Sequence, residues 1–223
     1  MEEAKKILLI GAGGHCLSVL DSLLSSCQYQ DIGIVDKKYE SNEPLADVKK
    51  TIMGVPIIGN DEDLELLFGK GYREAFVTVG SIGDVSLRKS LYQKVNKIGF
   101  KMPNIIDKTS VISSNVSLGE GIYVGKKAII NANTKIGNLA IINTSSVIEH
   151  ECEIEDFVHV APGVILCGNV CIGEETHIGA GSIIKQGVHI GTKTMIGMGS
   201  VVLKDVKDNT IAYGNPCREG NYE

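Results

Sequence analysis

The chain has 223 residues, enough for one large domain or two small ones, and 27 acidic against 22 basic side chains give a net charge of −5. This net negative charge argues against a broad positively charged surface that would bind DNA, RNA or anionic lipid. No apolar run approaches the roughly 18 residues of a membrane span and no signal-peptide pattern precedes the first strand-like segment, so we expect a soluble, cytoplasmic protein without a membrane span.

Residues 1–103 alternate strand-like and helix-like segments. We expect strands at residues 5–10, in a segment ending at Asp36, and at 75–79, with helices at 17–24, 62–68 and 86–98. A glycine turn, residues 11–15, joins the first strand to the first helix. Strands that alternate with helices predict a small parallel sheet of Rossmann type, ending near Pro103.

Residues 104–223 follow a different period. Every sixth residue from Ile106 to Val202 is aliphatic, without a break. The position two residues earlier is mostly small or β-branched, and the position just after is often Gly or Asn. Neither the helical nor the strand period produces this spacing, which is the hexapeptide repeat of a parallel β-helix.

The repeat also predicts where each residue type lies. The aliphatic and small residues point inward, and Gly or Asn occupies a corner where a positive φ or close crowding is required. Three hexads make one triangular coil, so we expect five to six coils, with residues 18 apart stacked roughly 4.8 Å from each other. Because the period is unbroken, no long loop is expected to leave a coil.

The cysteines predict no disulfide framework. None of the six belongs to a CxxC pair, and a chain of this size does not depend on disulfides, so buried free thiols are expected. Cys152 occupies an inward small position, which favours a structural role over that of a nucleophile.

The glycine turn is the first candidate site. Its spacing, Gly11-x-Gly13-x-x-Cys16, lacks the third glycine of the dinucleotide fingerprint, although Asp36 lies about 20 residues on. The turn aims backbone N–H groups and a helix N-terminus at one place, which suits a phosphate, although a tight turn without a ligand is the alternative. Asp36 and Gly80 follow predicted strands, so both fall at the same edge of the sheet.

A histidine in the repeat is the second candidate. His150 lies two residues after the inward Ile148, so its ring faces outward from a corner. Glu149 and Glu151 flank it and are suited to orienting the imidazole as a general base. Gly168 lies 18 residues on, which places a backbone N–H one coil above the ring, where it can meet an oxyanion. The alternative is a solvated surface histidine.

A histidine column adds to this second candidate. His159 and His177 are 18 residues apart, so they are predicted to stack on each other in neighbouring coils. Stacked imidazole rings are unusual on a solvated surface without a function.

These patterns resemble a known family. The [LIV]-[GN]-x-x-[STAV] period resembles the left-handed β-helix of the hexapeptide acyltransferases, and the handedness is implied by this resemblance alone. The run from Asn143 to Cys152, with His159 nine residues after His150 and an N-terminal Gly-x-Gly-Gly-His, resembles the bacterial acetyltransferases that make bacillosamine-type and perosamine-type sugars, and their sialic acid O-acetyltransferase relatives. The resemblance covers residues 5–218.

The resemblance implies a role for each matched residue. His150 is implied as the base, with Glu151 increasing its basicity. The residues implied to contact acetyl-CoA are His159, Gly168 and Ala180. Those implied to hold the nucleotide sugar are Gly13, Gly14, His15, Asp36 and Gly80.

We therefore expect direct acetyl transfer from acetyl-CoA to the amino group of a nucleotide-activated amino sugar, of the UDP-4-amino-4,6-dideoxy type, without a metal. A homotrimer is expected as well, because His150 and His159 are half a coil apart and cannot face one ligand on a single prism. Three alternatives remain. They are O-acetylation of sialic acid or another sugar hydroxyl, a γ-type carbonic anhydrase using His150, His159 and His177 on zinc, and a non-catalytic nucleotide-sugar sensor.

Overall fold

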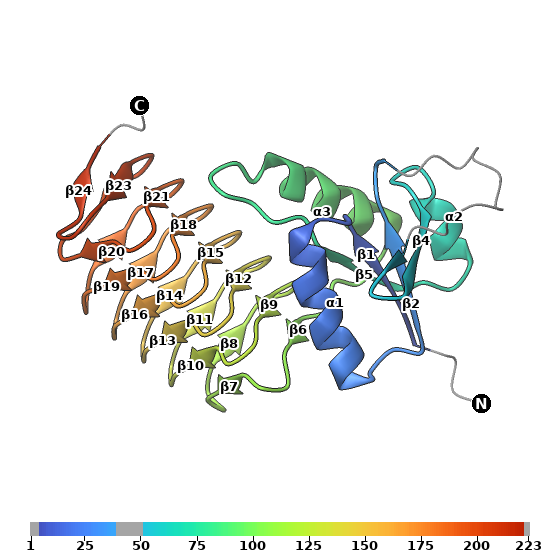
Figure 1. Ribbon diagram of the computed structural model, residues 1–223, viewed down its shortest axis with the longest axis horizontal. Helices are drawn as coiled ribbons and strands as arrows, with labels where there is room; N and C mark the ends of the chain where they lie inside the picture. The colour runs from blue at the N-terminus through green and yellow to red at the C-terminus, as the bar shows by residue number, and fades with distance from the viewer. Residues whose placement is uncertain (1–4, 39–50, 221–223) are drawn as a thin grey trace. The chain divides into compact units, whose positions relative to one another are not determined.

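The computed structural model describes residues 5–38 and 51–220, which form two compact units (Figure 1). The first contains the described residues up to Gly80 together with Ser86–Pro103. The second contains Ser81–Val85 and the described residues from Asn104 onward. The short segment Ser81–Val85 is thus grouped with the repeat, although it lies between two elements of the first unit.

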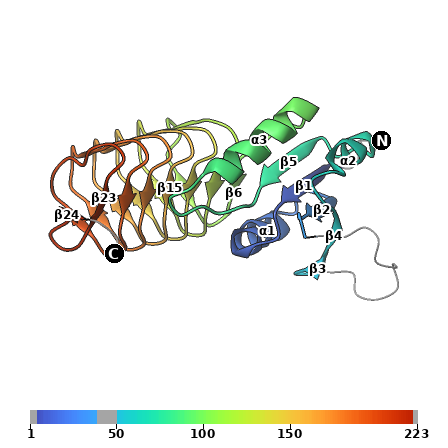
Figure 2. The same ribbon diagram turned by 90° about the horizontal axis from the view of Figure 1, so that it is seen from above.

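The first unit is a five-stranded sheet with helices on both faces. Its strands occur in the order β3-β4-β2-β1-β5, and all pair in parallel except β3, which is antiparallel to β4. Helix α1 covers one face, and α2 and α3 cover the other (Figure 2). The elements are β1 (Lys6–Ile10), α1 (Gly14–Ser26), β2 (Asp31–Val35), β3 (Thr51–Ile52), β4 (Val55–Gly59), α2 (Leu64–Gly69), β5 (Glu74–Val77) and α3 (Ser86–Ile98).

This arrangement confirms the predicted small parallel sheet and corrects three details. Helix α1 begins at Gly14, three residues before the predicted start, because the glycine turn leads directly into it and Cys16 N already donates to Gly13 O. Strands β3 and β4 were not predicted; β3 has only two residues, and β4 contains Pro56, a residue uncommon inside strands. Pro56 is accommodated where β4 pairs with the short edge strand β3. No helix in the described ranges is long and apolar enough to span a membrane.

The second unit is a parallel β-helix with three faces, as the repeat predicts. Face I contains β6 (Ile105–Ile106), β9 (Tyr123–Val124), β12 (Ile141–Ile142), β15 (His159–Val160), β18 (His177–Ile178), β21 (Met195–Ile196) and β23 (Ile211–Tyr213), and the antiparallel β24 (Arg218–Glu219) closes it. Face II contains β7 (Val111–Ile112), β10 (Ile129–Ile130), β13 (Val147–Ile148), β16 (Ile165–Leu166), β19 (Ile183–Ile184) and β22 (Val201–Val202). Face III contains β8 (Ser117–Leu118), β11 (Lys135–Ile136), β14 (Glu153–Ile154), β17 (Cys171–Ile172) and β20 (His189–Ile190).

The inward positions are those that the period predicts. From β9 to β22 the second residue of each strand is aliphatic and buried, as in Ile130, Ile148 and Ile184, whereas Ile106, the first residue of the predicted inward series, is 38% exposed at the end of the β-helix. Small residues share this interior, and their hydroxyls are satisfied. Thr134 Oγ1 donates to Glu149 O at 2.9 Å, and Thr176 Oγ1 donates to Gly191 O at 2.6 Å.

At each corner of the β-helix, close packing and a positive φ affect two different residue positions. Where glycine follows the inward aliphatic residue, crowding requires it, since a Cβ at Gly137 would lie 2.6 Å from the Glu155 carbonyl carbon. The positive φ falls two residues later, where Asn133 has φ 60° and Glu151 has φ 61°. This left-handed position accepts many residue types, and it controls where the Glu151 side chain points.

Candidate functional site

Gly11 shapes the turn between β1 and α1. Its N–H donates to Val35 O at 2.8 Å, and its carbonyl accepts from Thr78 Oγ1 at 2.6 Å. Its φ is +107°, and a Cβ there would lie 2.7 Å from Val79 Cγ2. Glycine at this position is therefore required by the fold itself.

Gly13 and Gly14 differ from Gly11, because a Cβ at either would meet no atom within 4 Å. Gly13 is the N-cap of α1 and has an extended backbone; no side chain caps the helix, and its first turn has no acidic residue. Both glycines are exposed. The positive end of the helix dipole therefore faces open space, which suits an anion such as a phosphate.

The other predicted sugar-nucleotide residues surround this turn. Asp36 Oδ2 accepts from Ala12 N at 2.8 Å, and its Oδ1 accepts from Lys38 N at 3.0 Å. A Cβ at Gly80 would lie 3.4 Å from the Cβ of His15. The structure thus brings Gly13, Gly14, His15, Asp36 and Gly80 to the carboxyl edge of the parallel strands.

His150 and Glu151 form a pair at the corner between β13 and β14. His150 Nδ1 lies 3.0 Å from Glu151 Oε2, and both side chains are about half exposed. A carboxylate only accepts, so this contact assigns the proton to Nδ1 and leaves the lone pair on Nε2. The sequence offered Glu149 as a second orienting carboxylate, but within the described residues only Glu151 bonds to the ring.

Gly168 packs against this imidazole from the next coil, as the 18-residue register predicts. A Cβ at residue 168 would lie 2.6 Å from His150 Cε1 and 2.7 Å from Nε2. Only a residue without a side chain leaves the ring in this position.

The N–H of Gly168 differs from some corner N–H groups of the repeat that side chains cap. Asn138 N donates to Asp156 Oδ1 at 2.7 Å, and Thr192 N donates to Asp208 Oδ1 at 2.8 Å. The Gly168 N–H has no acceptor within residues 5–38 and 51–220. It is available to an oxygen atom of a ligand beside His150.

Cys152 is excluded as the nucleophile by its surroundings. It is fully buried, and burial raises the pKa of its thiol to about 11. Its Sγ faces the carbonyl oxygens of Cys167 and His150 at 3.3 and 3.8 Å. The thiolate is therefore negligible at neutral pH, which confirms the structural role predicted from its position.

His159 stacks with His177 on face I, as their spacing predicts. The two ring centroids lie 4.8 Å apart in an edge-to-face arrangement. His159 Nδ1 lies 3.0 Å from Ser81 O, and Nε2 lies 3.3 Å from Asn143 Nδ2. The Ser81 carbonyl assigns the proton to Nδ1, so Nε2 accepts from the Asn143 amide. The repeat gives no signal for the contact with Ser81, because residues 81 and 159 are related only by the tertiary fold.

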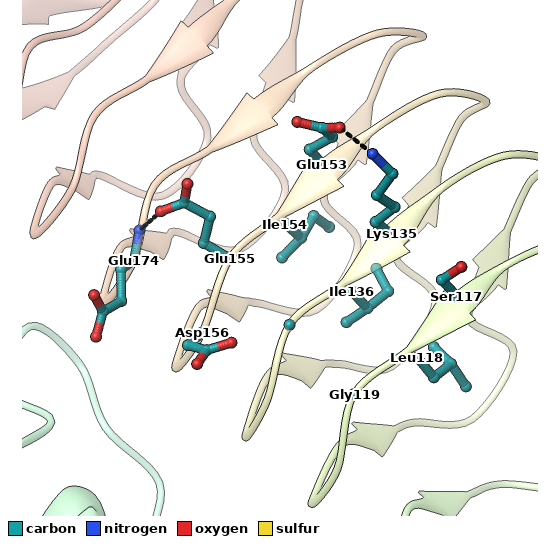
Figure 3. Close-up of a pocket in the computed structure, with 11 residues that line it drawn as sticks. Ser117, Leu118, Gly119, Lys135, Ile136, Glu153, Ile154, Glu155, Asp156 and Glu174 are labelled. Carbon is teal, nitrogen blue, oxygen red and sulfur yellow. Dashed lines mark hydrogen bonds and ion pairs between the residues drawn. The ribbon is translucent and has the colours of Figure 1, made fainter.

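A groove of about 600 Å³ lies on face III (Figure 3). Its charged lining residues are mostly acidic, and two of them are bonded within the fold: Glu153 pairs with Lys135 at 2.7 Å, and Glu155 Oε2 accepts from Glu174 N at 2.8 Å. An acidic groove repels the phosphates of a coenzyme such as CoA. Its lining includes none of the predicted site residues.

In the β-helix, the predicted residues form two groups. His150, Glu151 and Gly168 lie together on the corner where face II passes into face III. His159 lies on face I, and Ala180 lies on the corner where face I passes into face II. A cluster of three or more His, Cys, Asp or Glu side chains suited to a metal is absent from the described part of the chain.

Two family models match the sequence. Residues 6–95 match the PglD N-terminal domain, and residues 169–204 match the hexapeptide repeat of succinyl-transferase. No curated protein gives a significant match.

Solved structures match nearly the whole chain. A histidine variant of perosamine N-acetyltransferase from Caulobacter crescentus, in complex with CoA and GDP-perosamine, is 36% identical, with a TM-score of 0.87 and 97% coverage of both chains. The acetyltransferase domain of PglB from Neisseria gonorrhoeae, in complex with acetyl coenzyme A, is 29% identical, with a TM-score of 0.87, and the match covers 97% of this chain and 100% of that one. WeeI from Acinetobacter baumannii shares the fold, with a TM-score of 0.81 and coverage of 96% and 99%. The chain therefore belongs to the nucleotide-sugar N-acetyltransferases that are built on a left-handed hexapeptide-repeat β-helix.

Proposed function

We propose that this chain transfers the acetyl group of acetyl-CoA to the amino group of a nucleotide-linked 4-amino-4,6-dideoxy sugar, with His150 as general base. The observation that carries the proposal is the contact of 3.0 Å between His150 Nδ1 and Glu151 Oε2, beside the backbone of Gly168. Relatives with the same fold bind CoA with GDP-perosamine or acetyl coenzyme A, which supports both substrates.

The reaction is a direct transfer. The amine of the sugar attacks the thioester carbonyl carbon, and Nε2 of His150 takes the proton that the nitrogen loses. Glu151 stabilises the imidazolium, and the N–H of Gly168 donates to the oxyanion of the tetrahedral intermediate. The intermediate collapses with breakage of the carbon–sulfur bond, and the thiolate of CoA receives the proton from the imidazolium. The products are the N-acetyl sugar and CoA.

The two substrates are assigned to different residues. The turn at Gly13 and Gly14 suits the phosphates of the sugar nucleotide, with Asp36 held beside it by Ala12. His159, Gly168 and Ala180 are assigned to acetyl-CoA.

We also propose that the enzyme is a homotrimer with its active sites between subunits. His150 lies on one corner of the β-helix, and His159 lies on face I beyond the opposite edge of face II. A neighbouring subunit related by a three-fold axis brings its own His159 to His150.

The test is a panel of acceptors assayed for CoA release with a thiol reagent. The panel contains UDP- and GDP-linked 4-amino-4,6-dideoxy sugars, the corresponding 4-hydroxy sugars, and sialic acid. The proposal predicts release with an amino sugar and none with its hydroxyl counterpart. Turnover of sialic acid alone would identify an O-acetyltransferase, and binding of a sugar nucleotide without CoA release would identify a sensor.

A further inference from the structure

His177 is a buried histidine that the proposed reaction does not use. Of the five histidines, all of which lie in the described ranges, only His177 is buried, with 9% of its surface exposed. Its Nδ1 has no hydrogen-bond partner among the described residues, and burial lowers the pKa of the ring, which is therefore neutral at neutral pH. An unsatisfied polar atom inside a protein costs free energy. The presence of an imidazole here therefore indicates a role other than stabilising the fold.

The column of outward side chains that contains His177 is otherwise apolar around the two histidines. Parallel pairing on face I places His177 between His159 of β15 and Met195 of β21. The next residue of the column is Ile141 on the side of His159 and Ile211 on the side of Met195. Aliphatic side chains are therefore acceptable at these outward positions, and the coil geometry does not require an imidazole at residue 177.

The segment that joins β5 to α3 and belongs to the second unit covers this part of the column. The Ser81 carbonyl oxygen lies 3.0 Å from His159 Nδ1. Two residues later, Gly83 has a φ of +83°, and a Cβ there would lie 2.8 Å from Met195 Cε. These two contacts lie on either side of His177 in the column. The segment therefore passes over His177 and accounts for its burial.

The imidazole of His159 is held from three directions. Its Nδ1 contacts the Ser81 carbonyl at 3.0 Å, and its Nε2 contacts the Asn143 amide at 3.3 Å. The third direction is occupied by the His177 ring, whose centroid lies 4.8 Å away at an interplanar angle of 66°. The two hydrogen bonds fix which ring atoms face which partners, and an edge-to-face neighbour fixes the plane of the ring. Without the His177 ring, the His159 ring is free to tilt away from the Ser81 carbonyl.

We propose that His177 is a positioning residue for acetyl-CoA binding, because its buried ring holds the His159 imidazole in one orientation and in the Nδ1–H tautomer. His177 acts through His159 and does not itself contact the coenzyme. A ring that is already oriented loses little conformational freedom when a ligand binds, so the effect falls on the affinity for acetyl-CoA and not on the chemical step. The inference rests on the proposed function, which assigns His159 to acetyl-CoA, and it adds the residue that orients His159.

The first test is the Kd of acetyl-CoA, measured by isothermal titration calorimetry without a sugar. His177→Ala should weaken binding by about tenfold, a size typical of the coupling between side chains in contact. His177→Phe keeps an aromatic ring against His159 and should bind nearly as tightly as the wild type. At saturating acetyl-CoA, kcat and the KM for the sugar nucleotide should be unchanged in both variants. Ile190→Ala, which removes a buried side chain from face III, is the control and should lower stability without changing the Kd.

The second test is a double-mutant cycle, which asks whether His177 acts through His159. In a His159→Ala background, His177→Ala should cause no further loss of affinity, because the ring that it orients is absent. Equal losses in the two backgrounds would overturn the inference, since His177 would then act on something other than His159. His177→Leu, which has no ring but fills part of the space with an apolar side chain, replaces His177→Ala in both tests if circular dichroism shows that the alanine variant is unfolded.

The third test observes the orientation of His159 without any ligand. In the nitrogen NMR spectrum of protein labelled in its histidine rings, the His159 signals, identified by their loss in His159→Ala, should show the Nδ1–H tautomer in the wild type and in His177→Phe. His177→Ala should show a mixture of tautomers. A single Nδ1–H tautomer in His177→Ala would overturn the inference.

The outcomes separate this inference from the proposed function. A wild type that binds no acetyl-CoA would overturn the proposed function, whereas the NMR comparison would still decide whether His177 orients His159. If the wild type binds acetyl-CoA, His159→Ala binds it weakly and His177→Ala binds it as the wild type does, this inference alone is overturned.

Discussion

The imidazole of His150 rests on the backbone of Gly168, where a Cβ would come within 2.6 Å of Cε1 and 2.7 Å of Nε2. The atoms in the way belong to an exposed side chain that can move, so Gly168→Ala should leave the fold stable and displace the ring. A displacement of about 1 Å is enough to lower kcat by about 100-fold. Steady-state kinetics and thermal unfolding of the variant separate the two effects.

Gly173→Ala is the matched control for Gly168→Ala. There a Cβ would lie 2.6 Å from Thr192 N and 2.7 Å from the carbonyl carbon of Gly191, both backbone atoms of the next coil. We expect a loss of about 1–3 kcal/mol in the free energy of unfolding, measured by denaturant titration. If Gly168→Ala instead lost stability and kept its kcat, the Gly168 backbone would have no role beside the base.

The negative charge of Glu151 should affect kcat more than the shape of its side chain does. Glu151→Gln keeps the length of the side chain but removes the negative charge 3.0 Å from His150 Nδ1. Because the imidazolium forms during the reaction, kcat should fall by about tenfold or more, while KM for both substrates stays near the wild-type value. Glu153→Gln, on face III, is the control. Equal effects of the two substitutions would contradict the assignment.

The glycine turn offers a test of the nucleotide site. A Cβ at Gly14 meets no atom of the chain within 4 Å, so Gly14→Val should fold normally and project into the space assigned to the phosphates. We predict a higher KM for the sugar nucleotide and an unchanged KM for acetyl-CoA.

Gly11→Ala is the contrast for this test, because it should destabilise the first unit through its φ of +107° and its contact with Val79. A rise in the KM for acetyl-CoA in Gly14→Val would show that the substrates are assigned to the wrong residues.

Much of the candidate site was predictable because the repeat fixes its register. The 18-residue spacing places Gly168 over His150 and His177 over His159 before any coordinates are known, and both contacts are present. Both contacts can be predicted from the length of one coil and from the fact that these side chains point outward.

Other features were not predictable, for identifiable reasons. The hydrogen bond between His159 and Ser81 joins residues 78 apart in the sequence, and no period relates them. Strand β4 was not predicted, and it contains Pro56, a poor strand residue away from an edge, so its sequence carries a weak strand signal. Gly and Asn after the inward aliphatic residue suggested either crowding or a positive φ, and only the structure places the positive φ at residues such as Glu151.

The buried His177 should make the protein sensitive to acid. Burial lowers the pKa of His177 below its ordinary value of 6.5, and its Nδ1 has no hydrogen-bond partner among the described residues. The unfolded chain therefore binds a proton more readily than the folded one, so stability is complete above the unfolded pKa and falls as the pH drops below about 6.5. His177→Phe keeps an aromatic ring against His159 and should reduce the loss of Tm between pH 8 and pH 5.5. An unchanged loss would show that His177 does not titrate on unfolding.

The most direct test of the account is the kcat of His150→Ala. General-base assistance contributes about 10²–10⁴-fold, so kcat for CoA release with an amino-sugar nucleotide should fall by that factor. KM for both substrates should stay near the wild-type value, because the ring acts mainly in the transition state. His189→Ala, which removes an exposed imidazole from β20, should have wild-type kinetics. A His150→Ala enzyme with wild-type kcat would contradict the account and leave His150 as a solvated surface residue.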